Sequence, residues 1–170
     1  HKNALVKRTI SMVINKKILD RIDIKILDIL QHNGRISNVD LANQVHLSPS
    51  PCLERVRNLE KHGYIKEYVA HLNPELLDAA LVAYIEISLK RTATKNLDNF
   101  NKRMLQLDEV VECVMVAGGF DYLIKIRTES MQTYRTFLGE KLAAIEGIAQ
   151  THTYAVMEEV KSTHLIPVEK

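Results

Sequence analysis

The segment Leu47–Ile65 (LSPSPCLERVRNLEKHGYI) carries residue types that can recognise DNA. Proline is tolerated in a first helical turn and glycine ends a helix, so Pro49-Ser50-Pro51 and Gly63 bound a predicted helix capped by Ser48 or Ser50. If its apolar residues Leu53, Val56 and Leu59 face inward, the opposite face presents Ser50, Pro51, Glu54, Arg55 and Asn58, with Arg57 and Lys61 at its edges. Arg, Asn and Ser bind base edges in the major groove, and flanking cations neutralise phosphates. The segment is a candidate DNA-reading helix.

The distribution of charge favours the same interpretation. Residues 1–72 contain 12 Lys/Arg and 7 Asp/Glu, a balance of +5, whereas residues 73–170 contain 11 and 14, a balance of −3. A basic first half suits a polyanionic partner. Short amphipathic helices with a solvated basic face also occur in domains that never touch DNA, so the pattern alone leaves both interpretations open.

The rest of the sequence offers no catalytic or metal-binding constellation. It has no phosphate-binding glycine loop followed by Lys-Ser/Thr, no His pair four residues apart, and no Ser or Cys with an evident base. Cys52 and Cys113 form no CxxC pair, and we expect Cys52 to be a small packing residue. The neighbours Gly118-Gly119 are more typical of a hairpin turn than of a binding loop. We therefore expect no enzyme, no metal and no cofactor.

Two further helices must position the candidate DNA-reading helix. Apolar spacing predicts one over Leu19–Leu30, with Asp20 and Asp23 near its start, and Asn33-Gly34 ends it. A second begins at Ser37 or Asn38. After the third, Tyr64–Ala70 alternates polar and apolar residues and predicts a wing or linking strand.

The second half predicts an α+β unit. Strands are expected over Leu81–Leu89, Val110–Val116, Tyr122–Arg127 and Ile148–Val156, with helices from about Lys95 and after the cap Ser130. This βαββαβ order is that of a ferredoxin-like domain, with both helices on one face of an antiparallel sheet. The other face, with Val82, Tyr84 and Met115, would expose an apolar patch, so we expect a dimer at least.

Both halves resemble the Lrp/AsnC family, and its leucine-responsive branch more than AsnC. The resemblance covers about residues 18–161. Its segments are LDRIDIKIL (19–27), GRISNVDLA (34–42), the candidate DNA-reading segment (47–65), LNPELLDAAL (72–81), GGFDYLIKIR (118–127) and TYAVMEEVK (153–161).

The resemblance implies an N-terminal winged helix-turn-helix over residues 18–72, a linker at 73–79, and a C-terminal ferredoxin-like domain for ligand sensing and oligomerisation over 80–161. Tails occupy 1–17 and 162–170. Implied partners are double-stranded DNA, an amino-acid effector, and further copies of the chain in homodimers that assemble to octamers. The expected DNA-binding residues are Arg35, Asn38, Ser48, Ser50, Pro51, Arg55, Arg57 and Asn58. The expected effector residues are Met115, Gly118, Gly119, Phe120, Asp121, Met131, Tyr154, Ala155 and Val156.

One position departs from the family pattern. Gly119 stands where the family commonly has an acidic residue, so Asp121 is the remaining carboxylate of this turn. The apolar residues around it suit leucine or methionine, because burying a charged side chain among them is costly.

We therefore expect a transcription regulator of amino-acid metabolism that responds to a small amino acid. One alternative is a ligand-independent architectural DNA-organising protein of the same fold. Another, an enzyme or metabolic subunit with a regulatory domain, is disfavoured by the absent catalytic set. No stretch of about 18 apolar residues and no secretory signal is present, which predicts a cytoplasmic, nucleoid-associated protein with no membrane partner.

Overall fold

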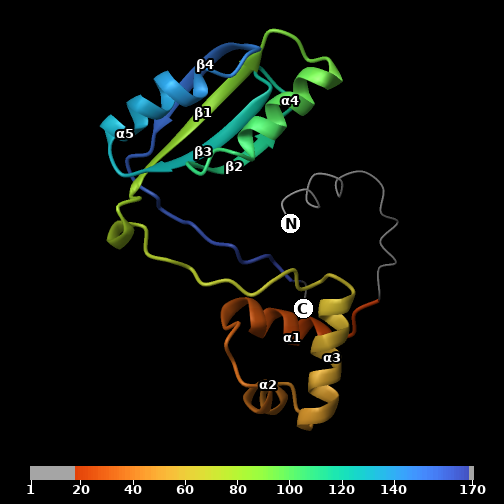
Figure 1. Ribbon diagram of the computed structural model, residues 1–170. Helices are drawn as coiled ribbons and strands as arrows, with labels where there is room; N and C mark the ends of the chain where they lie inside the picture. Colours follow the sequence, from red (N-terminus) through yellow and green to blue (C-terminus); the bar gives the residue numbers. More distant parts are fainter. Residues whose placement is uncertain (1–17, 169–170) are drawn as a thin grey trace. The chain divides into compact units, whose positions relative to one another are not determined.

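The computed structural model of the chain describes residues 18–168, so the predicted N-terminal tail lies outside the described residues. The chain divides into two compact units (Figure 1). Of the described residues, the first combines 18–70 with the C-terminal segment 163–168, and the second is His71–Ser162. The C-terminal segment, treated above as a tail, thus groups with the N-terminal helices.

The first unit contains α1 (Arg21–His32), α2 (Asn38–Gln44) and α3 (Pro49–Lys61). Side chains cap α1 and α2. Ser37, one of the two predicted candidates, caps α2, whereas Asp20, predicted only as an acid near the helix start, caps α1. The Asp20 carboxylate accepts a hydrogen bond from the Asp23 amide at 2.8 Å, and the Ser37 hydroxyl accepts one from Asp40 at 3.1 Å. Such bonds satisfy amide groups that have no partner within the helix. The core consists of Ile26, Leu41, Ala42, Val45, Cys52 and Leu59.

The buried side of α3 differs from the prediction. Cys52 and Leu59 are fully buried, whereas Leu53 is 37% exposed, so the assignment of Leu53 to the core was wrong. At about 100° per residue, this rotates the buried stripe away from Leu53 and towards Arg55. The prediction was wrong because it assigned Leu53 to the core in preference to the smaller Cys52. It also assumed that Arg55, as a charged residue, lies on the exposed face.

The predicted strand over Tyr64–Ala70 is also absent from the described part of the chain. Alternating residues form a strand only where a second strand supplies hydrogen bonds, and none pairs with this segment here. Instead, Tyr64 and Ile65 pack against the helical core. The Tyr68 hydroxyl donates to Glu60 at 3.0 Å, which holds the segment on α3.

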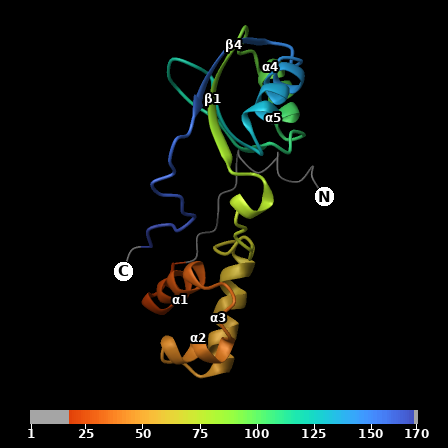
Figure 2. The same cartoon turned by 90° about the vertical axis from the view of Figure 1, so that its left-hand side faces the viewer.

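The second unit has the predicted order of elements, and each lies close to its expected range. After the 3-10 helix η3 (Glu75–Leu77), it contains β1 (Leu81–Leu89), α4 (Thr94–Met104), β2 (Val110–Met115), β3 (Tyr122–Thr128), α5 (Met131–Thr136), the π-helix η4 (Phe137–Leu142) and β4 (Ile148–Ala155). The sheet order is β2-β3-β1-β4, with all neighbours antiparallel. Figure 2 shows α4 and α5 on the same side of the sheet.

The two faces of the sheet carry different residues. Ile85, Ile124 and Ile126 lie in the core beneath the helices, and the Tyr134 hydroxyl of α5 donates to Thr153 of β4 at 2.6 Å. The pairings Tyr84↔Lys125 and Tyr84↔Tyr154 place these side chains on the open face.

The open face is less apolar than predicted. Val82 is buried within the single chain. Met115 pairs with Tyr122, a core residue, which assigns it to the helix side of the sheet. The cation of Lys125 lies 5.6 Å from the centre of the Tyr84 ring. Fewer apolar residues on the open face therefore need to be covered by a second chain; those that remain include Tyr84 and Leu123.

Candidate DNA interface and effector site

Arg55 is half-buried and forms ion pairs within the helical unit. Its guanidinium donates to the Asp20 carboxylate at 2.7 Å and to the Asp23 carboxylate at 2.8 Å. These bonds, and above all the one that Arg55 donates to Asp20, raise the pKa of Arg55. Hydrogen bonding from the Asp23 amide and then from Arg55 lowers the pKa of Asp20. The expectation that Arg55 lies on the outward face of α3 was wrong, because it joins α3 to α1.

Asp23 is the residue that the sequence analysis missed as Arg55's partner. It is 1% exposed, and a buried carboxylate is stable only when it is paired and hydrogen-bonded. The available signal was its spacing from Asp20, since a second acid three residues after an acidic cap lies on an adjoining part of the first turn.

The remaining outward face of α3 consists of Ser50, Leu53, Glu54, Arg57 and Lys61, all exposed. Arg57 and Lys61 take part in no ion pair among the described residues. Exposed serine, arginine and lysine side chains can bind base edges and phosphates, and an exposed leucine can contact a thymine methyl group. This set, hereafter the outer face of α3, is polar, basic and accessible.

The other predicted DNA-binding residues lie around the start of α3. Asn38 donates through its side-chain amide to the carbonyl of Pro49 at 2.8 Å, which ties α2 to α3. Ser48 precedes α3 without making a side-chain cap bond. Arg35 and Pro51 are exposed, whereas Asn58 is half-buried. Asn38 and Asn58 are thus less accessible than predicted, and Arg35, Ser48 and Pro51 lie on the surface.

One chain does not bring the predicted effector residues together. Asp121 donates its amide to the Ile87 carbonyl at 3.0 Å, which places the turn of residues 117–121 and Met115 at one end of β1. Ala155 pairs with Ala83, and the Val156 amide donates to Val82 at 2.9 Å, so the last strand ends at the other. Met131 follows Thr128, which pairs with Leu81 at that same end.

The two groups are well separated. Ile87 and Ala83 are four residues apart on β1, which corresponds to roughly 13 Å along the strand. The first group contains Met115, Gly118, Gly119, Phe120 and Asp121, and the second Met131, Tyr154, Ala155 and Val156. Within one chain, therefore, they line no common pocket.

Asp121 already has a structural role. Its carboxylate accepts a hydrogen bond from the Leu89 amide at 2.7 Å, and its carbonyl accepts one from Val116 at 3.0 Å. The second carboxylate oxygen has acceptor capacity left, as an ionised carboxylate has about four lone-pair sites. One aspartate can therefore fix the turn and still bind an ammonium group.

Among residues 18–168 no cluster of three His, Cys, Asp or Glu side chains could hold a metal ion. No helix in that range is long and apolar enough to cross a membrane.

Comparisons with known proteins match both units. Residues 19–66 match the winged helix-turn-helix DNA-binding domain, and residues 82–166 match the Lrp/AsnC ligand-binding domain. The chain is 50% identical over 153 residues to the leucine-responsive regulatory proteins of Escherichia coli and Klebsiella pneumoniae, covering 90% of this chain and 93% of each relative.

Solved structures agree. A transcriptional regulator from Neisseria meningitidis, determined as a complex with L-methionine, superimposes with a TM-score of 0.85 at 37% identity, over 88% of this chain and 97% of that chain. AsnC of Escherichia coli gives a TM-score of 0.81 at 26% identity, over 89% of this chain and 100% of that chain.

Proposed function

The chain belongs to the Lrp/AsnC family of DNA-binding transcription regulators, and on this premise we propose that it controls genes of amino-acid metabolism in response to leucine or methionine. Its relatives are regulators rather than enzymes. The observation that carries the proposal is the outer face of α3, where Ser50, Leu53 and Arg57 are exposed while Arg55 is engaged within the domain. A helix of this kind fits the major groove.

In this proposal Arg57 and Lys61 neutralise phosphates or bind guanine, and Ser50 and Leu53 contact base edges. Arg35, Ser48 and Pro51 at the surface and Asn38 at the α2–α3 junction complete the expected interface. Arg55 acts indirectly, because its ion pairs with α1 fix the position of α3.

The effector site is proposed to form between copies of the chain. The two groups of expected effector residues lie at opposite ends of the sheet, so a second chain that brings its own end against the first would unite them. Homodimers assembling to octamers would supply such contacts. The Neisseria relative binds L-methionine, and several relatives are named leucine-responsive, which supports an aliphatic or thioether effector here. A cytoplasmic, nucleoid-associated location follows from this function.

The DNA-binding part is tested on a duplex selected from a random library with the protein itself. Arg57→Ala should weaken binding and lower the slope of log affinity against log salt by about one, because one phosphate or base contact is lost. Lys102→Ala, which removes an exposed cation from α4 in the other unit, is the control. An unchanged affinity and slope in Arg57→Ala would remove this residue from the interface.

The effector part is tested by titrating leucine, methionine and lysine into the protein with and without the selected duplex. Leucine or methionine should bind and shift DNA affinity, and lysine should not, because its ammonium side chain would be buried without a partner. Sedimentation at the same concentrations measures assembly. DNA binding that ignores all three amino acids would favour the architectural alternative.

A further inference from the structure

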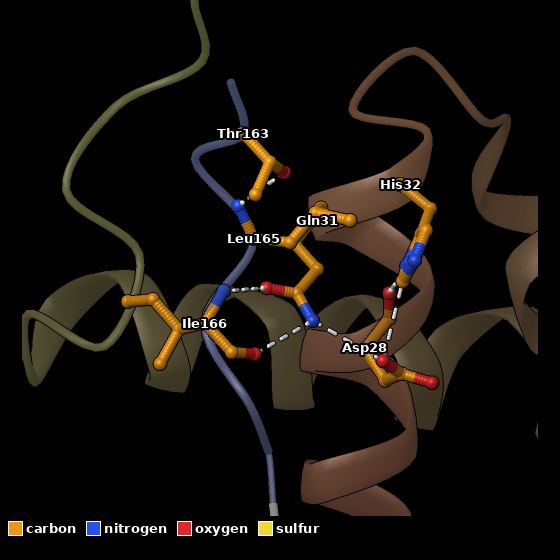
Figure 3. A network of polar contacts seen from close by, with 6 residues as sticks. All are labelled: Asp28, Gln31, His32, Thr163, Leu165 and Ile166. Carbon is orange, nitrogen blue, oxygen red and sulfur yellow. Dashed lines mark hydrogen bonds and ion pairs between the residues drawn. The ribbon is translucent and has the colours of Figure 1, made fainter. Parts of the chain in front are cut away.

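The C-terminal segment is bound to α1 through its main chain. The side-chain amide of Gln31 donates to the Ile166 carbonyl at 3.1 Å, and its oxygen accepts from the Ile166 amide at 2.9 Å (Figure 3). The same Gln31 nitrogen donates to Asp28 at 3.2 Å, which fixes the amide orientation. The Ile166 side chain is 70% exposed, so Gln31 recognises backbone and not a particular side chain.

The segment is shaped for this contact by its own sequence. Pro167 follows Ile166, and a residue before proline is restricted to an extended conformation. In an extended residue the main-chain N–H and C=O point to the same side. Both groups of Ile166 can therefore bond to one carboxamide, that of Gln31, which offers an acceptor oxygen and a donor nitrogen side by side. The Thr163 hydroxyl accepts from the Leu165 amide at 3.1 Å and shapes the approach. Little ordering entropy therefore opposes docking.

The chain is also fixed just before this segment. After β4 ends, Glu159 pairs with Lys125 at 2.7 Å and with Arg127 at 3.0 Å, which holds residues 156–159 on the open face of the sheet. Residues 160–165 lie between this anchor and Ile166. The seven steps from Glu159 to Ile166, at about 3.5 Å each, span at most roughly 25 Å. The ligand-binding unit thus reaches α1 through a short connection, in addition to the one that follows α3.

α1 in turn determines the position of α3. The helix carries Gln31 in its last turn, and at its start Asp23 and the cap Asp20 bind Arg55 of α3. A displacement of the C-terminal segment therefore acts on the same helix that orients the outer face of α3.

We propose that Thr163–Val168 is a strap, docked on α1 by Gln31, through which the state of the ligand-binding unit reaches the DNA-binding helices. The docking stands on the contacts above, and its regulatory role rests on the proposed function. The strap follows β4 in the chain after residues 156–162, and Tyr154, Ala155 and Val156 at the end of that strand are expected to meet the effector. Movement of that strand end on ligand binding would pull on the six-residue connection.

Docking is tested by hydrogen exchange of the full chain, without DNA or amino acid. Gln31→Ala should raise exchange of the Ile166 amide about tenfold, since two hydrogen bonds are lost, and should loosen the last turn of α1. Gln132→Ala is the matched control, because this exposed glutamine of α5 makes no side-chain hydrogen bond in the described chain. Unchanged exchange in Gln31→Ala would overturn the docking, and circular dichroism verifies that the variant is folded.

The tether role is tested with a chain that ends at Ser162. Adding a synthetic peptide of residues 161–170 should restore the protection of α1, because the docking site is intact. It should not restore the effect of leucine or methionine on DNA affinity, because the covalent connection is missing. The ratio of DNA Kd values with and without amino acid should therefore fall towards one in the truncated chain, with or without peptide.

The outcomes separate the claims. If the truncated chain keeps the parental ratio, the strap transmits nothing and the regulatory role is overturned. If leucine and methionine leave the DNA affinity of the parent chain unchanged, the proposed amino-acid response is wrong, and so is the regulatory role of the strap. The docking of the strap on α1 is still decided separately by hydrogen exchange of the Ile166 amide. Calorimetry of leucine and methionine with the truncated chain must show retained binding; loss of binding would make the segment part of the effector site instead of a strap.

Discussion

Arg55 of α3 binds Asp23 of α1 at 2.8 Å, and Asp23 is 1% exposed. The pair links residues that are 32 positions apart. Removing the cation of a buried pair is costly, because the carboxylate loses a charge-assisted hydrogen bond that offsets its burial. The ion pair therefore determines where α3 lies relative to α1, and a residue type associated with DNA contact has a structural role here.

Replacing Arg55 by Ala should lower the stability of the helical unit by about 2 to 3 kcal/mol. This is less than for a fully buried pair, because the Arg55 side chain is 30% exposed and partly screened by solvent. Urea unfolding read by hydrogen exchange of α1 and α3 measures the change. Arg57→Ala, on the outer face, should stay within about 0.5 kcal/mol. Equal stabilities of the two variants would contradict the structural role of Arg55.

Features set by near neighbours in the chain could be predicted, and those set by distant partners could not. The predicted cap Ser130 is confirmed, and of the two candidates Ser37 and Asn38 the structure selects Ser37; each hydroxyl accepts a hydrogen bond from the amide three residues on. The strand predicted over Leu81–Leu89 is confirmed, because β1 has these bounds. The orientation of Arg55 depends on Asp23 of α1, so the spacing of residues within α3 could not predict it.

Distant partners also account for the other differences between sequence and structure. Tyr64–Ala70 has a strand-like pattern, but strand formation needs a partner that the segment does not find in the described chain. The docking of Ile166 on Gln31 joins positions 135 apart through main-chain atoms, which have no sequence signature. The effector residues were grouped by resemblance, and only the sheet register shows that they occupy two ends of one chain.

The rotated face of α3 gives opposite expectations for two leucines. Leu59→Ala should destabilise the helical unit by about 2 to 5 kcal/mol, because the residue is fully buried and leaves a cavity. Leu53→Ala should cost less than about 1 kcal/mol and weaken binding to the selected duplex. A larger stability loss for Leu53→Ala than for Leu59→Ala, measured by urea unfolding, would restore the face originally predicted.

The DNA contact of Leu53 is tested by replacing each thymine of the selected duplex with deoxyuridine, which removes one methyl group. Replacing the thymine that Leu53 contacts should lower the affinity of the parent protein about fourfold. This corresponds to the loss of about 0.8 kcal/mol for one buried methyl group. Leu53→Ala should be insensitive at that position, whereas Glu54→Ala should keep the parental response. Parental sensitivity at every thymine in Leu53→Ala would place this leucine outside the interface.

Two substitutions of Asp121 distinguish its structural role in the turn from its proposed role in ligand binding. Asp121→Asn keeps an oxygen that can accept from the Leu89 amide, so the turn should remain intact, but it removes the charge available to an effector ammonium. Affinity for leucine, measured by calorimetry, should fall about tenfold or more, the value of a charge-assisted hydrogen bond. Asp121→Ala should in addition destabilise the turn. Parental affinity in Asp121→Asn would mean that backbone carbonyls or another residue hold the ammonium.

The ion pair of Asp20 and Arg55 should make the stability of the helical unit depend on pH in the acid range. Bonds from the Asp23 amide and from Arg55 hold the pKa of Asp20 below its ordinary value of 3.8. A lowered pKa in the folded state means that the ionised form stabilises the fold. This contribution is complete above the unfolded value and is lost as the pH falls through the folded one.

Asp20→Asn isolates the effect, because asparagine is also a good helix cap but carries no charge. The parent should be more stable than this variant by less than about 1 kcal/mol, since the pair is exposed. That difference should be constant from pH 7 to about pH 5 and should shrink towards zero below about pH 4, as Asp20 becomes protonated. Urea unfolding of both proteins, read by hydrogen exchange of α1 over this range, measures it. A difference that persists undiminished at pH 2 would show that the charge of Asp20 contributes nothing and that the two side chains differ only as caps.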